Sequence, residues 1–221
     1  MKLSYFATRV ARYGVFAGAV LASASGVFAQ QGCLPVSDRT GEVGCWITEV
    51  TPLGKFSTGQ AYWHIDSFPS RSDAESAKST RGTVVESLGK IWLFTIADAE
   101  WRAPSGTRVA EVGPLLVAAG TDYTAQYMEA IFTPGMTART HRHSGPEAWY
   151  TLSGETCLET PEGKVVGRAG GRNVIVPHGP PMHLTATGKE MRRALVLILH
   201  DSSQPATTLA EDWTPKGLCR Q

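Results

Sequence analysis

The chain has 221 residues, of which 42% are hydrophobic and 19% are charged, and its formal net charge is +1. This length and composition are typical of one globular domain, or of one domain with a sizeable extension. The charge is nearly balanced and the sequence contains no block of basic residues. Nucleic acids and anionic membrane surfaces are therefore not expected as partners.

The first 29 residues predict a secretory signal peptide. A front with three basic side chains precedes an apolar or small stretch at 15–27. Residues 27–29 then offer the small side chains that a signal peptidase reads, so we expect cleavage before Gln30. Loss of the three basic side chains leaves 18 basic against 20 acidic ones. We therefore expect an exported protein, either periplasmic or secreted.

All four cysteines follow the expected cleavage point: Cys33, Cys45, Cys157 and Cys219. An even number of cysteines in an exported chain predicts at least one disulfide. Three connectivities are possible, and the sequence does not choose between them. Cys33 with Cys45 would be the most local closure, and Cys157 with Cys219 would then tie the C-terminal tail to the domain.

Residues 30–107 are expected to form a β-rich N-terminal region. β-Branched and aromatic residues favour strands at 45–50, at 59–66 and across 82–97, and residues 70–78 favour one short capped helix. Two interpretations remain open. The region is either a degenerate, metal-free repeat of the domain that follows, or a set of strands that extends the sheets of a single barrel. The second is favoured, because internal similarity between the two halves is weak.

Short strands at regular intervals are predicted between residues 108 and 200. Their expected ranges are 108–112, 115–118, 123–132, 157–160, 164–167 and 193–200. Turns rich in glycine and proline separate them, including one at 113–114. Evenly spaced short strands with such turns are typical of a sandwich or a barrel. Residues 201–221 are interpreted as a loop-like tail.

The stretch at 135–154 carries the side chains that point to chemistry. His141 and His143 are two residues apart, so on a strand both imidazoles face the same side. A short turn at 144–146 can bring Glu147 to the same place from the next strand. Two imidazoles and a carboxylate suit one divalent transition metal, and Mn, Fe, Ni, Cu and Zn are all compatible with them.

The spacing Gly-x5-His-x-His-x3-Glu-x6-Gly, which begins at residue 135, resembles the first motif of the cupin family. Residues 171–179, Gly-Arg-Asn-Val-Ile-Val-Pro-His-Gly, resemble the first part of the second cupin motif. The family pattern places a fourth histidine ligand at position 182, where this chain has Met182 followed by His183. The resemblance implies an all-β fold, a cupin jelly-roll barrel over residues 108–200 with a metal at its centre, and a homodimer.

The face on which His183 lies decides whether it is the fourth ligand, because a shift of one residue moves a side chain to the opposite face of a strand. If the two prolines before Met182 absorb the extra residue as a bulge, His183 faces the metal, with Thr185 and Thr187 along the cavity. If they do not, Met182 faces inward and His183 points outward. We expect the first arrangement. The expected ligands are then His141, His143, Glu147 and His183.

The function that these residues favour is that of an exported, metal-binding cupin. An oxygenase-like oxidoreductase of the dioxygenase type, acting on a small organic molecule, is the first candidate. Glu147 is the candidate catalytic base, and Trp149 shares its strand face and is a candidate for the substrate cavity. Two alternatives remain open. One is a non-catalytic ligand-binding or sensory module of the cell envelope, and the other is a metal-dependent isomerase or lyase of the same fold.

Overall fold

The computed structural model describes residues 29–30, 32–171 and 173–220, and within these ranges the chain is an all-β protein with one short α-helix. The predicted signal peptide falls outside the described residues, apart from Ala29. The helix α1 (Arg71–Ala77) lies where the sequence predicts one, and the Ser70 side chain caps it by accepting from the backbone N–H of Asp73. No helix in the described part of the chain has the length and apolar character needed to cross a membrane.

The remaining elements are strands and one 3-10 turn, η1 (Val36–Asp38). The strands are β1 (Ala29–Gln30), β2 (Leu34–Pro35), β3 (Gly44–Lys55), β4 (Gln60–Phe68), β5 (Gly82–Ser87), β6 (Lys90–Ala97), β7 (Thr107–Leu116), β8 (Asp122–Phe132), β9 (Thr137–Ala138), β10 (His141–Arg142), β11 (Glu147–Ser153), β12 (Glu155–Thr160), β13 (Gly163–Arg168), β14 (Val174–Val176), β15 (His183–Thr187), β16 (Arg192–Asp201) and β17 (Thr208–Leu209).

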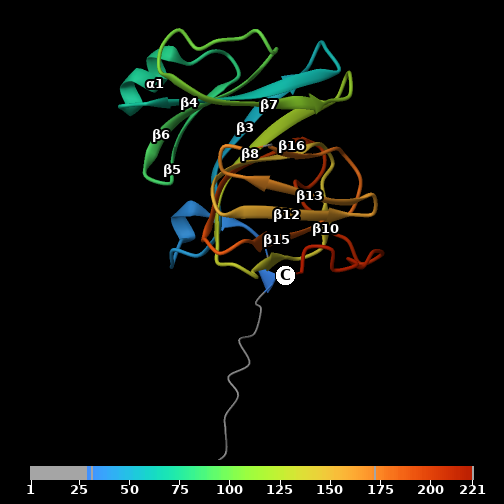
Figure 1. Cartoon of the computed structure of the whole chain (residues 1–221). Helices are drawn as coiled ribbons and strands as arrows, with labels where there is room; N and C mark the ends of the chain where they lie inside the picture. Colours follow the sequence, from blue (N-terminus) through green and yellow to red (C-terminus); the bar gives the residue numbers. More distant parts are fainter. Residues whose placement is uncertain (1–28, 31, 172, 221) are drawn as a thin grey trace, which may run out of the picture.

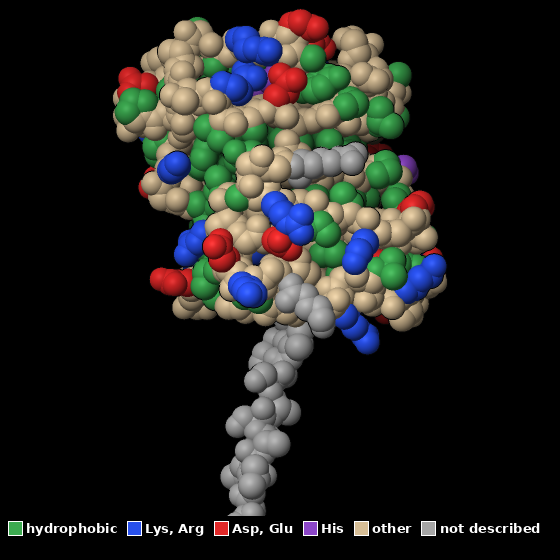
Figure 2. Space-filling view, in the orientation of Figure 1, with side chains coloured by type: hydrophobic (Ala, Val, Ile, Leu, Met, Phe, Trp, Pro, Cys, Tyr) green, Lys and Arg blue, Asp and Glu red, His purple; other side chains and the backbone are tan. Residues whose placement is uncertain are grey.

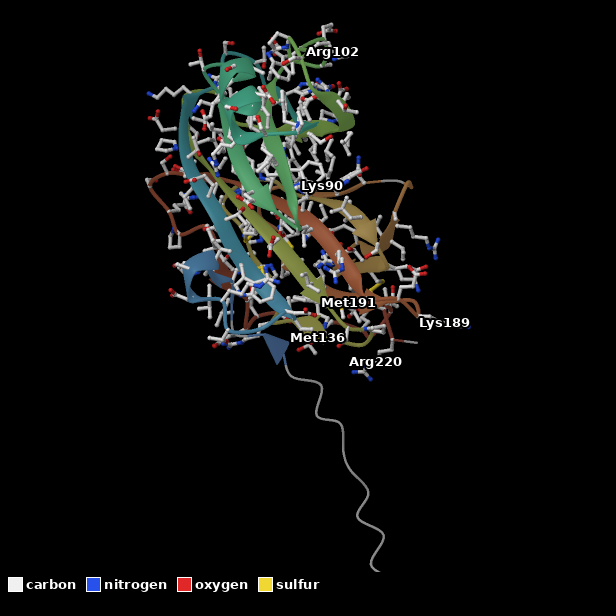
Figure 3. The ribbon with its side chains drawn as sticks, turned by 90° about the vertical axis from the view of Figure 1, so that its left-hand side faces the viewer. Lys90, Arg102, Met136, Lys189, Met191 and Arg220 are labelled. Carbon is white, nitrogen blue, oxygen red and sulfur yellow. A yellow bond between two sulfur atoms is a disulfide. The ribbon has the colours of Figure 1, made fainter. Side chains whose placement is uncertain are left out.

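The strands form three stacked layers (Figure 1). The middle layer is a six-stranded sheet in the order β14-β11-β16-β8-β3-β2, and its long strands β3, β8 and β16 run side by side (Figure 3). One outer layer has the order β5-β6-β4-β7, and the other has the order β1-β9-β15-β12-β13. The short strands β10 and β17 form a separate pair. The middle sheet and the sheet that contains β15 form the double-sheet jelly roll, as the sequence predicts.

One face of the middle sheet packs against the N-terminal sheet. Tyr127 of β8 and Leu195 of β16 point to this side, where they join the aromatic side chains of Trp63, Trp92 and Phe94. All five residues are almost completely buried. Burying a large apolar side chain stabilises a fold by about 1.5–3 kcal/mol, so this aromatic core holds the N-terminal sheet firmly on the barrel.

The opposite face of the same sheet lines the barrel interior. Met128 of β8 and Val196 of β16 differ in parity from the residues of the first core, so they point to the other side. There they pack with Leu158 and Leu184 of the facing sheet. The alternation along β8 and β16 therefore gives one sheet two cores, and the interior of the barrel belongs to the second.

The sheets do not divide the chain at residue 108. The strand β3, which lies within 30–107, pairs along its length with β8 and so extends the middle sheet of the barrel. The strand β7 (Thr107–Leu116) instead pairs with β4 in the N-terminal sheet. It also continues through Gly113 and Pro114, where the sequence suggested a turn.

Two disulfides hold segments at the edges of the barrel. Cys33 is bonded to Cys45 of β3, and Cys157 of β12 is bonded to Cys219 in the C-terminal tail. The prediction of at least one disulfide is confirmed. On the molecular face in Figure 2, acidic and basic side chains are scattered among each other without a block of one sign.

Candidate metal centre

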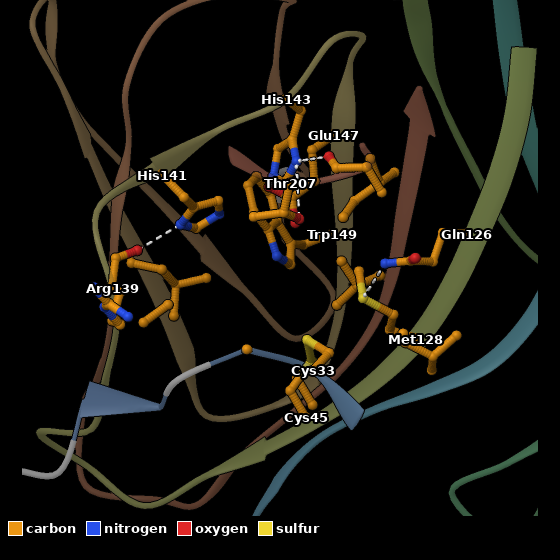
Figure 4. A pocket seen from close by; sticks show the side chains of 18 of the residues that line it. Cys33, Cys45, Gln126, Met128, Arg139, His141, His143, Glu147, Trp149 and Thr207 are labelled. Carbon is orange, nitrogen blue, oxygen red and sulfur yellow. Dashed lines mark hydrogen bonds and ion pairs between the residues drawn. A yellow bond between two sulfur atoms is a disulfide. The ribbon is translucent and has the colours of Figure 1, made fainter. Parts of the chain in front are cut away.

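A cavity of about 370 Å³ lies inside the barrel (Figure 4). Its walls are mostly apolar and come from both facing sheets. They include Met128, Phe132, Trp149, Leu184, Val196 and Ile198. The polar side chains that reach this cavity are few, and they include His141, His143 and Glu147. A mostly apolar cavity with a few convergent polar groups is the usual form of a small-molecule site.

His141, His143 and Glu147 lie together at this cavity. One ligand atom from each of the three falls within 4.8 Å of the others. His141 lies in β10, and His143 is the first residue after this strand. Glu147 is the first residue of β11. The two imidazole rings meet edge to face with their centroids 4.8 Å apart. His143 and Glu147 are 3% and 4% exposed, so both of these potential metal ligands are shielded from bulk water.

The turn between the two histidines and the glutamate depends on Gly145. A Cβ atom at this position would lie 1.9 Å from the carbonyl oxygen of Leu199 in β16, so a larger residue does not fit there. The neighbouring carbonyl of Pro146 accepts a hydrogen bond of 2.9 Å from the backbone N–H of Leu199. This close approach fixes the start of β11 against β16 and brings Glu147 beside His143.

Both imidazoles are oriented by backbone carbonyls. The Nδ1 atom of His141 lies 2.5 Å from the carbonyl oxygen of Arg139, and that of His143 lies 2.5 Å from the carbonyl oxygen of Ala206. A carbonyl only accepts, so each Nδ1 carries a proton and donates it. In a neutral ring the lone pair is then on Nε2. Because metal-binding histidines are commonly fixed in this way, the arrangement fits a divalent metal held through the two Nε2 atoms and the carboxylate.

The two histidines differ in their titration. Burial lowers the pKa of His141, although the charge of Glu147 opposes this. Burial acts in the same direction on His143, but the charge of Glu147, its hydrogen bond and the hydrogen bond to the Ala206 carbonyl together outweigh burial and raise the pKa of His143. The hydrogen bond with Glu147 joins Nε2 of His143 to the carboxylate over 2.9 Å. Without a metal, this pair therefore shares a proton at the place where an ion would bind.

The structure corrects the expected fourth ligand, His183. Met182 is 1% exposed and belongs to the barrel core, and its backbone pairs with that of His141. The next side chain, His183, therefore points to the opposite face. Thr185 and Thr187 share its parity, and all three line a different cavity beside Glu159. The two prolines before Met182 did not absorb the extra residue as a bulge. His183 therefore stays one position away from the inward-facing residue of its strand, and Met182 takes that place.

Of the expected cavity residues, Trp149 lines the cavity of the candidate metal centre, whereas Thr185 and Thr187 do not. Sequence reasoning missed two contributors. The carbonyl of Ala206, in the C-terminal tail, accepts the hydrogen bond that orients His143. The two residues are far apart in the sequence, so no local pattern reveals this contact. Arg192 also lines this cavity, and its alternation with Ala194, Val196 and Ile198 along one strand face could have revealed it.

Comparison with known proteins gives no family model and no curated protein that matches the sequence. Solved structures do match. A cupin superfamily protein from Desulfitobacterium hafniense is 17% identical, with 39% of this chain and 74% of that chain covered and a TM-score of 0.32. A cupin-like protein from Thermotoga maritima is 15% identical, with 42% and 70% covered and a TM-score of 0.37. The DMSP lyase DddQ from Ruegeria pomeroyi is 22% identical, with 42% and 45% covered and a TM-score of 0.34.

The sheets of this chain form the facing two-sheet barrel that the resemblance to cupins implies. The likenesses to solved structures are distant and carry no statement about activity. Within the described residues, the barrel of this chain groups two imidazoles and one carboxylate without a fourth nitrogen or carboxylate ligand. Such a set, with coordination positions left open, is typical of non-haem iron(II) oxygenases.

Proposed function

We propose that this protein is a metal-dependent cupin enzyme of the oxygenase type that acts on a small organic molecule. The observation that supports it is the meeting of His141, His143 and Glu147 within 4.8 Å at a mostly apolar cavity. A bound divalent ion would supply Lewis acidity and, if it is iron, a redox centre at its open positions.

The protein's own groups prepare this site in three ways. The carbonyls of Arg139 and Ala206 hold the proton of each neutral imidazole on Nδ1, which leaves the Nε2 lone pairs as the metal-binding atoms. The apolar walls exclude water and favour a substrate with an apolar body. Glu147 lies beside the cavity in hydrogen-bond contact with His143, so we propose it as the group that takes or returns a proton during the reaction.

The proposal includes export from the cytoplasm. Its support is the presence of two disulfides, with no free cysteine among the described residues. Disulfides form and persist in oxidising compartments such as the periplasm or the cell exterior.

A non-catalytic ligand-binding module is the second candidate. The observation that favours it is the outward position of His183, which removes the fourth ligand that the cupin motif would supply. Such a protein would bind the same small molecules in the same cavity but would release them unchanged.

Oxygen uptake tests the proposed function. Protein reconstituted with iron(II) under anaerobic conditions is mixed with a panel of small apolar and aromatic acids, and oxygen consumption and substrate loss are followed together. We expect uptake in step with substrate loss in the wild type, and neither in His141→Ala. Substrate loss without oxygen uptake would instead indicate an isomerase or lyase. Substrates that bind and return unchanged would indicate the binding module.

A further inference from the structure

Arg192 is a fully buried cation at the wall of the cavity. It is 0% exposed and begins β16, where it shares a strand face with the cavity residues Val196 and Ile198. Close contact with Gly154 fixes its backbone, because a Cβ atom on Gly154 would lie 2.8 Å from the Cα atom of Arg192. Arginine is among the residues least often buried in this way unless a partner neutralises it.

The guanidinium of Arg192 is only partly satisfied. Its Nε donates a hydrogen bond of 2.5 Å to Oγ1 of Thr156, and its central carbon lies 5.4 Å from the ring centroid of Phe132, which lines the cavity. Neither Nη1 nor Nη2 has a hydrogen-bond partner among the described residues. Burial lowers the pKa of Arg192 to about 10, against the charge of Glu147, so the group still carries its charge at neutral pH.

The one carboxylate at the cavity does not neutralise Arg192 directly. Glu147 is engaged with His143 and lies at the other end of β11. Thr156, which holds the guanidinium, contacts Thr151, four residues beyond Glu147 on the same strand. No hydrogen bond or ion pair joins Glu147 to Arg192 among the described residues, and the charge of Glu147 only partly offsets the effect of burial on the Arg192 pKa.

A buried cation with two unpartnered donors is stabilised by an anion. Leaving a charge and its donors without partners costs far more free energy than pairing them. The planar guanidinium offers two parallel N–H groups, a geometry that matches a carboxylate. Arg139, exposed at the cavity, adds positive charge where an anion would enter.

We propose that Arg192 anchors the carboxylate of a small organic acid, whose apolar body fills the cavity and whose far end reaches His141, His143 and Glu147. The naming of this substrate class rests on the proposed function. The anion site itself does not, because Arg192 remains uncompensated whether or not a metal is bound.

Calorimetric titration of the metal-free full-length protein tests this anchor. The probes are three pairs of an acid and its amide: acetate and acetamide, benzoate and benzamide, phenylacetate and phenylacetamide. We expect at least one acid to bind about 10- to 100-fold more tightly than its amide, since a charge-assisted bond to a buried group is lost in the amide. In Arg192→Met this preference should disappear, and in Arg192→Lys it should be intermediate.

Arg193→Met is the matched control, because Arg193 has the same chemistry on the opposite face of the same strand and does not line the cavity. It should keep the acid preference. The thermal midpoint of Arg192→Met should equal or exceed that of the wild type without ligand, since removal of an unpaired buried charge is neutral or stabilising. A purely structural arginine would instead lower it.

Three results would overturn the anchor: equal binding of acid and amide by the wild type, binding of none of the acids, or wild-type acid binding by Arg192→Met. The first two need no variant, so they remain decisive even if Arg192→Met fails to fold. The titration is done without metal, so acid binding by Arg192 would still hold if the protein proved to bind no metal. Equally, failure of the acid to bind would leave the proposed metal site unaffected.

Discussion

At the scale of single residues, the environment of each imidazole decides its role. His141 and His143 have the same side chain, are two residues apart and both lie at the cavity, yet their pKa values move in opposite directions. Burial is the largest effect on both pKa values, but for His143 the charge and hydrogen bond of Glu147, together with the Ala206 carbonyl, outweigh it. A metal ion must displace the proton that His143 and Glu147 hold between them, so metal affinity should fall as the pH drops below the pKa of His143.

Replacing Glu147 by Gln should lower the pKa of His143. In the wild type the folded-state pKa is raised, so this pair stabilises the metal-free fold at low pH and loses that contribution as the pH rises through the raised value. In Glu147→Gln the charge is gone and burial remains, so the midpoint should drop below its ordinary value. NMR titration of the metal-free protein measures it. Glu155→Gln, remote from this pair, should leave the midpoint unchanged, and an unchanged midpoint in Glu147→Gln would contradict the assignment.

At the scale of elements, the site depends on how β10 and β11 are joined. The turn at 144–146 presses against β16 closely enough that only glycine fits at position 145. This turn sets the spacing between His143 and Glu147, so the glycine at position 145 has a geometric reason. Strand alternation then decides which of the following side chains reach the cavity.

Gly145→Ala should therefore damage both stability and metal binding. The added methyl group would meet the Leu199 carbonyl oxygen at 1.9 Å, and such overpacking typically costs about 1–3 kcal/mol. Urea unfolding and metal titration measure the two effects. Gly41→Ala is the control, because a Cβ atom there has open space around it. Equal stability of the two variants would show that the turn tolerates the methyl group and is not what positions Glu147.

Much of this local arrangement could be predicted from the sequence, and its failures have physical causes. The pair His141 and His143 and the short turn to Glu147 are local, so period and spacing sufficed to bring them together. His183 was misplaced because the two prolines allow either a bulge or an unshifted strand. Burial of Met182 in the barrel core, which is decided by packing between sheets, selected the second.

At the scale of the whole molecule, one sheet serves two cores. Its inner face forms the cavity and its outer face carries the N-terminal sheet. The all-β class and the barrel followed from strand spacing and motifs. The pairing of β3 with β8 joins residues that are 67 to 87 positions apart in the sequence, and local patterns do not report such pairing. The tail also closes the site from a distance, through the Ala206 carbonyl on His143.

Metal content across three histidine variants tests the central claim most directly. Full-length protein is stripped with a chelator, reloaded with iron(II) without oxygen, and analysed for iron bound per chain. The structure predicts one ion per chain in the wild type and in His183→Ala, and loss of the ion in His141→Ala and in His143→Ala, because only the last two supply ligands. Full metal content in His141→Ala, or loss of metal in His183→Ala, would contradict it.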